Sequence, residues 1–455
     1  MQTKGYRLWG KVVDGSLDEP IAEGVVVTSG ETIAWVGPAA ELPEAHAKAA
    51  LEDVRLPGRT IMPGLIDGHT HISFGEARSE EENALYAPAE FRSLRAVWNA
   101  KKILQAGVTS AFDAATTYNI AQAVRDAIDT GMFEGPRFAV SGKQITNHQG
   151  LEDSFPNNME FPVGQAAVLV KTKDDLVEAI RYQVKDEVDA IKVSGSNDNL
   201  ITPDALDASA FTYEELKIIA DETHRLGKIC GVHARSRQAA LDSIRAGFDI
   251  IFHASYIDDE GIEAALKTGC VITPTLTLLV NLIDAARAQA GAQAGASGMD
   301  AFKREVDAAS EGLSKAYRAG VPMIAGSESG WSPVPYGEWH GREMQIFVDL
   351  LGLSPLQAIH AGTLEPTRVL KRFGHQVGKL EAGRLADILV VDGDPTKDIT
   401  LLQKKSRFDF IFKGGRPVDR TPVPPRRRKW YERHKIFLDG VLHYDESTGA
   451  AVLEA

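Results

Sequence analysis

The chain has 455 residues, of which 44% are hydrophobic and 25% charged, and its formal net charge is −13. This composition is typical of a soluble globular protein with a large core, and the negative charge argues against a general binder of nucleic acid or anionic membranes. No apolar run is long enough to span a bilayer, and the first residues lack the apolar core of a signal peptide. Cys230 and Cys270 lie in apolar stretches, where reduced packing residues are expected. We therefore expect a cytoplasmic protein with no nucleic-acid or membrane partner.

The first 60 residues alternate apolar and polar side chains between glycines, prolines and aspartates, which predicts a small antiparallel sheet. From residue 61 short buried runs alternate with helical stretches, as parallel strands with crossover helices require. The helical stretches include 88–107, 211–227 and 258–269, and the last two end in glycine, which is preferred at a helix C-terminus. The predicted strands are 61–71, 107–114, 135–142, 190–195, 228–234, 249–255, 270–277 and 322–328. Eight such units predict a TIM-type (β/α)8 barrel over residues 61–370.

Strand-like patterns return after the barrel, at 377–395 and 408–418. We expect these strands to join the N-terminal ones, so that residues 1–60 and 371–420 form one small β domain from both chain ends. Residues 421–455 form a C-terminal extension that begins with a basic, proline-rich and aromatic stretch. This extension is either a solvated arm or a segment docked on a neighbouring subunit. Residues 285–298, rich in alanine and glycine, predict a mobile helix end or a lid.

Six polar side chains lie near the carboxyl ends of five predicted strands, and in a barrel the carboxyl ends of the strands meet at one mouth. A single buried histidine is more often a hydrogen-bonded core residue than a metal ligand, and one H-x-H pair is a weak signal. Packing does not explain the whole set, and imidazole and carboxylate groups are common ligands of divalent transition metals. The set is His69 and His71 after strand one, Lys192 on strand four, His233 on strand five, His253 on strand six and Glu328 on strand eight.

The motifs "MPGLIDGHTH", "IKVSGS", "VHA", "FHAS", "AGSES" and "GKLEAGRLADILVVD" together resemble the metal-dependent amidohydrolase superfamily. The likeness is to imidazolonepropionase-like hydrolases, which include prolidase-type dipeptidases, and it covers the chain up to about residue 418. The resemblance implies one or two divalent metal ions. We expect zinc, with cobalt or manganese as alternatives. In matching relatives the first-strand histidines bind the buried metal, the strand-four lysine is N-carboxylated and bridges two metals, and the histidines of strands five and six hold the exposed metal. These roles correspond to His69 and His71, to Lys192, and to His233 and His253.

The sequence departs from the family pattern at strand eight, where relatives carry aspartate and this chain carries Glu328. In the family that aspartate binds the buried metal and acts as general base, and glutamate can do the same acid–base chemistry. Its extra methylene group moves the carboxylate, so the number of metals and direct ligation by Glu328 stay open.

Further residues correspond to substrate contacts in the related hydrolases. His148, in the loop after strand three, matches a histidine that polarises the substrate carbonyl, and Tyr256 matches a tyrosine that contacts the substrate. Arg235 stands where relatives often have histidine, which makes it a candidate substrate or loop contact. Aromatic residues of three loops predict an apolar pocket. They are Phe74, Tyr86, Phe91, Phe155, Phe161, Trp331, Tyr336 and Trp339, of which Trp331 and Trp339 are the candidate substrate-binding residues.

These observations predict a metal-dependent hydrolase that cleaves the C–N bond of an amide, urea or carbamate in a largely apolar small molecule. The alternatives within the same fold are a dipeptidase for Xaa-Pro or Xaa-Arg substrates and an N-acyl amino-acid hydrolase. A deaminase is disfavoured, because deaminases usually lack the bridging lysine and have glutamate where this chain has Ser236. A non-catalytic scaffold is disfavoured because the ligand set is nearly complete. We expect the enzyme to be a homo-oligomer.

Overall fold

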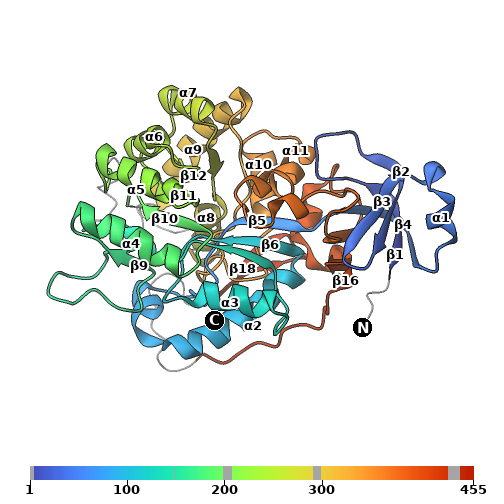
Figure 1. The fold of residues 1–455 in the computed structure, drawn as a ribbon, viewed down its shortest axis with the longest axis horizontal. Coiled ribbons are helices and arrows are strands. Elements are labelled where there is room, and N and C mark those ends of the chain that lie inside the picture. The colour runs from blue at the N-terminus through green and yellow to red at the C-terminus, as the bar shows by residue number, and fades with distance from the viewer. Residues whose placement is uncertain (1–4, 149, 198–207, 291–298, 429–440, 455) are drawn as a thin grey trace.

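The computed structural model describes residues 5–148, 150–197, 208–290, 299–428 and 441–454. Two parts are evident in Figure 1, a barrel surrounded by helices and a β-rich part beside it that contains the N-terminal strands and β16. The predicted fold class, a barrel with a small β domain from both chain ends, is confirmed. Of the segment 285–298 that predicted a lid, residues 291–298 lie outside the described residues.

The β domain is one seven-stranded sheet to which both ends of the chain contribute. Its order is β16 (Arg416–Pro417), β15 (Phe408–Lys413), β14 (Ile388–Asp392), β4 (Glu52–Pro63), β1 (Tyr6–Val12), β2 (Ile21–Ser29) and β3 (Thr32–Pro38). The expectation of a purely antiparallel sheet is wrong, because β1 and β4 are parallel. The chain leaves β3 at one edge, passes through α1 (Glu44–Lys48) and returns beside β1, so no hairpin sets the direction of β4.

The barrel strands lie where the sequence predicts them. They are β5 (Leu65–Thr70), β6 (Val108–Asp113), β7 (Arg137–Val140), β10 (Ala190–Ser194), β11 (Ile229–Ala234), β12 (Ile250–His253) and β13 (Val271–Thr273), followed by an irregular eighth segment at 322–328. Single bridges join this eighth segment to its neighbours, Met323 to Ile272 and, just beyond it, Ser329 to Thr70. The eighth segment is therefore less regularly paired than the other barrel strands. Its contacts with strand one are the main-chain hydrogen bonds described below.

The third barrel strand is bent, which the sequence pattern did not predict. Its first half, β7, pairs with β6, and its second half, β8 (Gln144–Thr146), pairs with β10 and β9 (Ala167–Leu169). Residues 141–143 therefore carry the chain from a three-stranded sheet to a six-stranded sheet. This bend joins the two sheets on one side of the barrel.

Helices cover the outside of the barrel, and capping side chains fix several of their ends. Thr172 and Thr212 form capping boxes, and Asp258 accepts the backbone N–H of Gly261. Gly269 closes its helix with φ 73°, as the sequence predicted. The helices are α2 (Ala89–Gln105), α3 (Ile120–Asp129), α4 (Lys173–Lys185), α5 (Tyr213–Arg225), α6 (Arg237–Ala246), α7 (Asp259–Thr268), α8 (Thr277–Ala290), α9 (Met299–Ala319), α10 (Arg342–Asp349) and α11 (Pro355–Ala361). Among the described residues, no helix has the length and apolar character needed to cross a bilayer.

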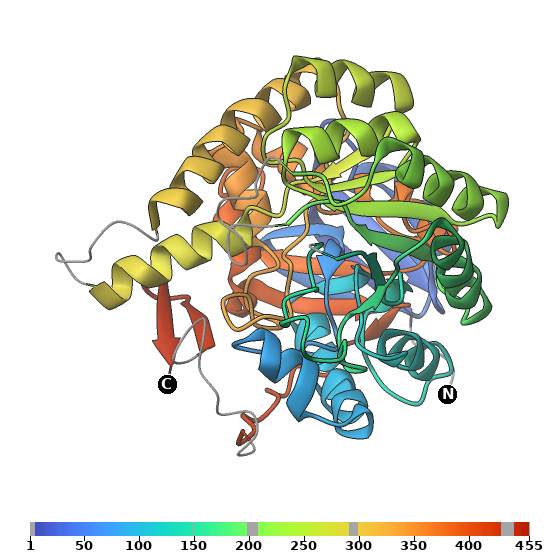
Figure 2. The same ribbon diagram turned by 90° about the vertical axis from the view of Figure 1, so that its left-hand side faces the viewer.

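The described parts of the C-terminal extension lie against this chain's own barrel. Arg428 pairs with Glu82 at 2.9 Å, and the hairpin of β17 (Val441–Asp445) and β18 (Ala450–Glu454) packs beside α8 (Figure 2). Leu442 is fully buried in this contact. The hairpin is therefore neither a solvated arm nor dependent on a second subunit for its packing. Residues 429–440 of the extension lie outside the described part of the chain.

Candidate metal and substrate site

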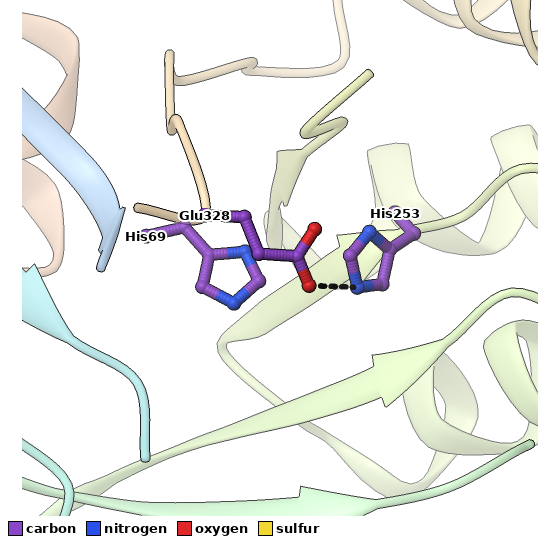
Figure 3. A group of neighbouring side chains, drawn as sticks. All are labelled: His69, His253 and Glu328. Atoms are coloured by element: carbon purple, nitrogen blue, oxygen red, sulfur yellow. Dashed lines mark ion pairs between the residues drawn. The ribbon is translucent and has the colours of Figure 1, made fainter. Parts of the chain in front are cut away.

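A pocket opens at the carboxyl ends of the barrel strands. Five of the six predicted metal ligands line it, and the sixth, His253, lies beside Glu328 (Figure 3). The lining consists of His69, His71, Phe74, Glu80, Gln144, Leu151, Glu152, Lys192, His233, Leu278, Leu282, Glu328, Trp331 and Pro333. The structure thus brings together candidate ligands as far apart in the sequence as His69 and Glu328.

Strands one and eight are joined at the pocket by their main chains. The N–H of Glu328 donates to the carbonyl of His69 at 2.7 Å, and the N–H of His71 donates to the carbonyl of Ser329 at 2.8 Å. Gly326 permits this approach, since a Cβ atom there would lie 2.7 Å from the Cβ of His69. These contacts place the carboxylate of strand eight beside the histidines of strand one.

The two histidines of strand one are oriented for ligation through Nε2. The hydroxyl of Thr275 donates to the carbonyl of Thr273, so at 3.0 Å it accepts the Nδ1–H of His69. The Nδ1–H of His71 donates to the carbonyl of Ala115 at 3.2 Å. Such partners on Nδ1 leave the Nε2 lone pair for a metal, an arrangement typical of metal-binding histidines.

His253 and Glu328 occupy strained backbone positions at the pocket. Their φ angles are 73° and 59°, in the left-handed region that non-glycine residues seldom adopt. The carbonyl of Phe252 accepts the N–H of Ala254 at 3.1 Å, so His253 is the centre of a γ-turn with positive φ, which is a strained type. Strain of this kind clusters at functional sites. His253 Nε2 lies 3.0 Å from His233 Nδ1 and 3.9 Å from Glu328 Oε1 (Figure 3).

Burial keeps the histidines of the site neutral. Burial, together with the charge of Lys192, lowers the pKa of His71 to about 3. Burial is also the main cause that lowers the pKa values of His69, His233 and His253 well below the usual range. A neutral imidazole has the lone pair that a metal requires, so the donor set fits a divalent transition metal ion.

Lys192, which lines the pocket, packs over the ring of the buried Phe252. Its Nζ atom lies 3.8 Å from the centre of the Phe252 ring, and the same ring is 4.4 Å from that of His69. Burial lowers the pKa of Lys192 to about 7, although the carboxylates of Glu328, Glu152 and Asp113 act in the opposite direction. A large fraction of the amine is therefore neutral near neutral pH.

An apolar wall faces the ligand cluster. Trp331 and Phe74 form an edge-to-face pair with ring centroids 5.0 Å apart, and Phe74 stacks on His71 at 4.4 Å. Leu278 and Leu282 of α8 complete the wall and pack with Leu442 of the C-terminal hairpin. The extension therefore supports one side of the pocket.

Some predicted substrate contacts lie elsewhere. Trp339 is fully buried behind the wall, where its Nε1–H donates to the carbonyl of Leu442 at 2.9 Å. The ring of His148 is exposed and pairs with Asp153 at 3.2 Å. Arg235 and Tyr256 are likewise absent from the residues that line the pocket. The sequence motifs place residues such as Arg235 and Tyr256 near the strand ends. The direction in which each side chain points depends on packing that a motif does not encode.

Five further predicted aromatic positions also lie outside the pocket lining. Tyr336 is buried and absent from the pocket lining, and its hydroxyl donates to the carbonyl of His71, a candidate ligand, at 2.6 Å. Phe91 and Tyr86 are not among the pocket-lining residues. The same is true of Phe155 and Phe161.

The sequence interpretation missed several residues of the site. Asp113, at the end of β6, accepts the N–H of Ile72 at 2.6 Å, and burial raises the pKa of its carboxyl well above the usual range. The position of Asp113 at the end of predicted strand two is the sequence feature that could have identified it as a site residue. Glu152, with φ 77°, lines the pocket from a loop, and Glu80 lines it from the start of the helical segment that ends at Tyr86. No sequence pattern marks either residue.

Comparison with known proteins agrees with this geometry. The sequence model described as the Amidohydrolase family matches residues 60–418. The chain belongs to the amidohydrolase family. Ochratoxinase from Aspergillus niger is 26% identical over 420 residues, which is 88% of this chain and 83% of that protein.

Solved structures share the amidohydrolase fold over almost the whole chain. The crystal structure of A. niger ochratoxinase has a TM-score of 0.80 at 24% identity and covers 92% of this chain and 96% of its own. A Xaa-Pro dipeptidase with bound methionine in the active site has a TM-score of 0.77 at 23% identity, with 91% and 99% covered. Phenylurea hydrolase B has a TM-score of 0.73 at 21% identity, with 93% and 99% covered.

Membership in the amidohydrolase family confirms the predicted enzyme class, a hydrolase that acts on C–N bonds of small molecules. The family is generally metal-dependent, and His69, His253 and Glu328 offer ligand atoms that all lie within 4.8 Å of one another.

Proposed function

We propose that this amidohydrolase cleaves an amide, urea or carbamate bond of a largely apolar small molecule with one or two divalent metal ions. The residues that would hold the metal are His69, His71, Lys192, His233, His253 and Glu328. The convergence of this set at the mouth of a pocket with an apolar wall carries the proposal. A bound divalent ion lowers the pKa of water and polarises a scissile carbonyl.

Zinc is the proposed metal, since imidazole and carboxylate ligands suit it, with cobalt or manganese as substitutes. We further propose that Lys192 is carboxylated on Nζ. A neutral amine is needed for the reaction with CO₂, and the lowered pKa of Lys192 supplies one near neutral pH.

Glu328 is the proposed general base and proton shuttle. Its carboxylate is 7% exposed and lies at the end of strand eight, 3.9 Å from His253. It would take a proton at a carboxylate oxygen from the attacking water and then pass it to the leaving nitrogen. Asp113 is less suited to this role, because burial raises its pKa and favours the protonated form.

Removal of the metal tests the proposal directly. Prolonged chelation should abolish activity, and Zn²⁺, Co²⁺ or Mn²⁺ should restore it. Elemental analysis of the purified protein gives the metal content independently of any assay. Full activity in protein shown to be metal-free would contradict the proposal.

The pocket supports a neutral substrate. Trp331, Phe74 and the leucines of α8 offer apolar contact for an aryl or alkyl group. Arg235, the candidate substrate or loop contact, is absent from the described lining residues, while Glu80 and Glu152 are present and would repel the carboxylate of a dipeptide. Relatives named ochratoxinase and phenylurea hydrolase B fit an aryl amide or aryl urea substrate.

A dipeptide is the second candidate, because the carboxylates of Glu80 and Glu152 could receive the ammonium group of its first residue. The neighbour named Xaa-Pro dipeptidase fits this alternative. A parallel assay should compare neutral N-aryl and N-alkyl amides, ureas and carbamates with Xaa-Pro and Xaa-Arg dipeptides and N-acyl amino acids. We expect the neutral compounds to have the higher kcat/KM, and an advantage of the dipeptides of about tenfold or more, that is ~1.4 kcal/mol, would select the peptidase.

Several finer features remain proposals. Polarisation of the substrate carbonyl by His148 requires its loop to move, since the ring now faces Asp153; Tyr256 would require a similar change to contact the substrate. A homo-oligomer in the cytoplasm is also proposed, and exposed Leu94 and Met132, which are 70% and 69% exposed, offer apolar surface for a subunit contact. Size-exclusion chromatography with light scattering measures the oligomeric state.

A further inference from the structure

A buried arginine lies beside the proposed general base. Arg235 follows β11 and is 1% exposed. Its Nη1 donates to Glu305 Oε1 at 2.9 Å, and its Nη2 lies 3.9 Å from Glu328 Oε2. Burial of a cation costs free energy unless the cation is paired with an anion. The carboxylate partners of Arg235 therefore determine the orientation of its guanidinium group.

Glu305 fixes that orientation from outside the barrel. It lies on α9 and is fully buried. Its Oε1 also accepts the hydroxyl of Ser255, which follows β12, at 2.7 Å. The N–H of Arg235 donates to Ser196 Oγ, which follows β10, at 2.9 Å. Glu305 and Arg235 thus connect the tips of three strands to one helix.

The arginine and His253 lie on either side of the Glu328 carboxylate. Oε1 is 3.9 Å from His253 Nε2, and Oε2 is 3.9 Å from Arg235 Nη2. Glutamate has one more side-chain torsion than aspartate, so a carboxylate of this length needs an additional constraint to stay aligned. In a site shielded from water the attraction between opposite charges is large enough to provide one.

We propose that Arg235, held by Glu305, is a positioning residue that fixes the Glu328 carboxylate for proton transfer. This inference rests on the proposed function, in which Glu328 is the general base. It assigns Arg235 a role in aligning the base and not in binding substrate. The family pattern has aspartate at the position of Glu328 and often has histidine at the position of Arg235. The proposed role of Arg235 links these two departures, because the arginine would hold the longer carboxylate in place.

The test removes the ion pair as a unit. Arg235→Met/Glu305→Met replaces both charges with apolar side chains, because removal of one partner alone would leave a buried charge. The change is made in the wild-type enzyme and in Glu328→Gln, and kcat, KM, zinc content and Tm are measured for all four proteins. If the arginine acts through Glu328, the pair substitution should lower kcat about tenfold or more in the wild type, with KM nearly unchanged. In Glu328→Gln the same substitution should cost less than about threefold.

Two further variants complete the experiment. Arg235→Lys keeps the positive charge and should lose less than the roughly tenfold in kcat expected of the pair variant. Because it is compared with the wild type, it tests the proposal even if the pair variant does not fold. Arg125→Met is the control, since Arg125 is also buried but pairs with Asp189, which precedes β10 at the opposite end of the barrel. It should lower Tm without changing kcat.

A readout independent of activity is the crystal structure of the zinc-loaded pair variant. The Glu328 carboxylate should leave its place beside His253 or occupy several rotamers. An equal loss of kcat in both backgrounds, with Glu328 unmoved, would overturn the positioning role while leaving Glu328 as the base. Near-normal kcat in Glu328→Gln would overturn both the inference and the proposed general base.

Discussion

Two clusters of potential metal-ligating side chains lie at opposite ends of the same strand, β11. At the carboxyl end His233 joins the group of His253, His69 and Glu328, and at the amino end Cys230 lies with His224 and Asp249. Within each of the two groups, His69–His253–Glu328 and His224–Cys230–Asp249, the possible ligand atoms are within 4.8 Å of one another. Distance alone therefore does not distinguish a metal centre from an ordinary hydrogen-bonded cluster.

The amino-end cluster satisfies its own hydrogen bonds. Asp249 Oδ2 accepts the N–H of Cys230 at 2.9 Å and lies 2.8 Å from His224 Nε2. His224 is 42% exposed, and burial raises the pKa of the Cys230 thiol well above its usual range. A thiol that stays protonated is a poor ligand, because the thiolate is the form that binds metal. This arrangement ties α5 to the start of two strands, which is a structural role typical of this end of the barrel.

The carboxyl-end cluster differs in ways that indicate function. Its histidines are buried and neutral, two of its residues have strained backbones, and a pocket opens above it. Such features cost stability and are kept where chemistry requires them. Desolvation, backbone strain and an adjoining cavity therefore distinguish the candidate metal site from the hydrogen-bonded cluster at the amino end of the strand.

The largest effect is expected from Lys192→Ala at the carboxyl end. Loss of the proposed bridging ligand should remove bound metal and reduce activity below detection, and a short carboxylic acid should partly restore both. Elemental analysis and an activity assay measure the two quantities. Cys230→Ala at the amino end is the control and should keep the wild-type metal content. Wild-type metal and rate in Lys192→Ala would show that the lysine is not a bridging ligand.

Exchange of a carboxylate for an amide at each end should give the next largest contrast. Glu328→Gln keeps the shape of the side chain and removes the base, so kcat should fall about a hundredfold or more. Glu328→Asp should also lose activity if the site is built for the longer side chain. Asp249→Asn should leave kcat within about twofold, because its role is structural. Steady-state kinetics on the four proteins decides the comparison, and a Gln variant with near-normal kcat contradicts the assignment.

The fold and the convergence of the candidate ligands could be predicted because they follow local rules. Buried runs of strand length gave the barrel, and His69, His71, Lys192, His233, His253 and Glu328 stand at the strand tips, where the chain direction fixes their position. The parallel pairing of β1 with β4 and the orientation of Trp339 could not be predicted, because each depends on contacts between residues far apart in the sequence. The same applies to Glu152, which enters the pocket from an irregular loop.

A smaller effect is expected at the apolar wall above the carboxyl-end cluster. Trp331→Ala should raise KM about tenfold and change kcat little, since the indole would bind substrate and transition state equally. Trp9→Ala is the control, because Trp9 lies on β1 in the β domain. It should leave KM unchanged. A fall in kcat at constant KM for Trp331→Ala would mean that this residue acts in the transition state and not in uniform binding.

The smallest effect concerns the pH dependence of stability at the amino end. Burial raises the pKa of the Cys230 thiol, and the charge of Asp249 acts in the same direction. Above the pKa of an unfolded cysteine, about 8.5, the folded state therefore holds a proton that the unfolded state has lost. The free energy of unfolding should then fall as pH rises through this range, by at most about 1.4 kcal/mol per pH unit for this thiol, and should not depend on it below about pH 8.

Cys230→Ala should remove that part of the slope between about pH 8.5 and 10. Cys270 remains in the variant, and burial raises its pKa to about 11, so a decline of similar origin should persist. Urea denaturation at a series of pH values measures both slopes. If the amino-end cluster held zinc, the thiol would be deprotonated in the folded state at neutral pH, and stability would instead fall on acidification. Identical slopes in the wild type and Cys230→Ala would show that the thiol does not titrate as its buried position predicts, and the contrast between the two ends of β11 would lose its chemical basis.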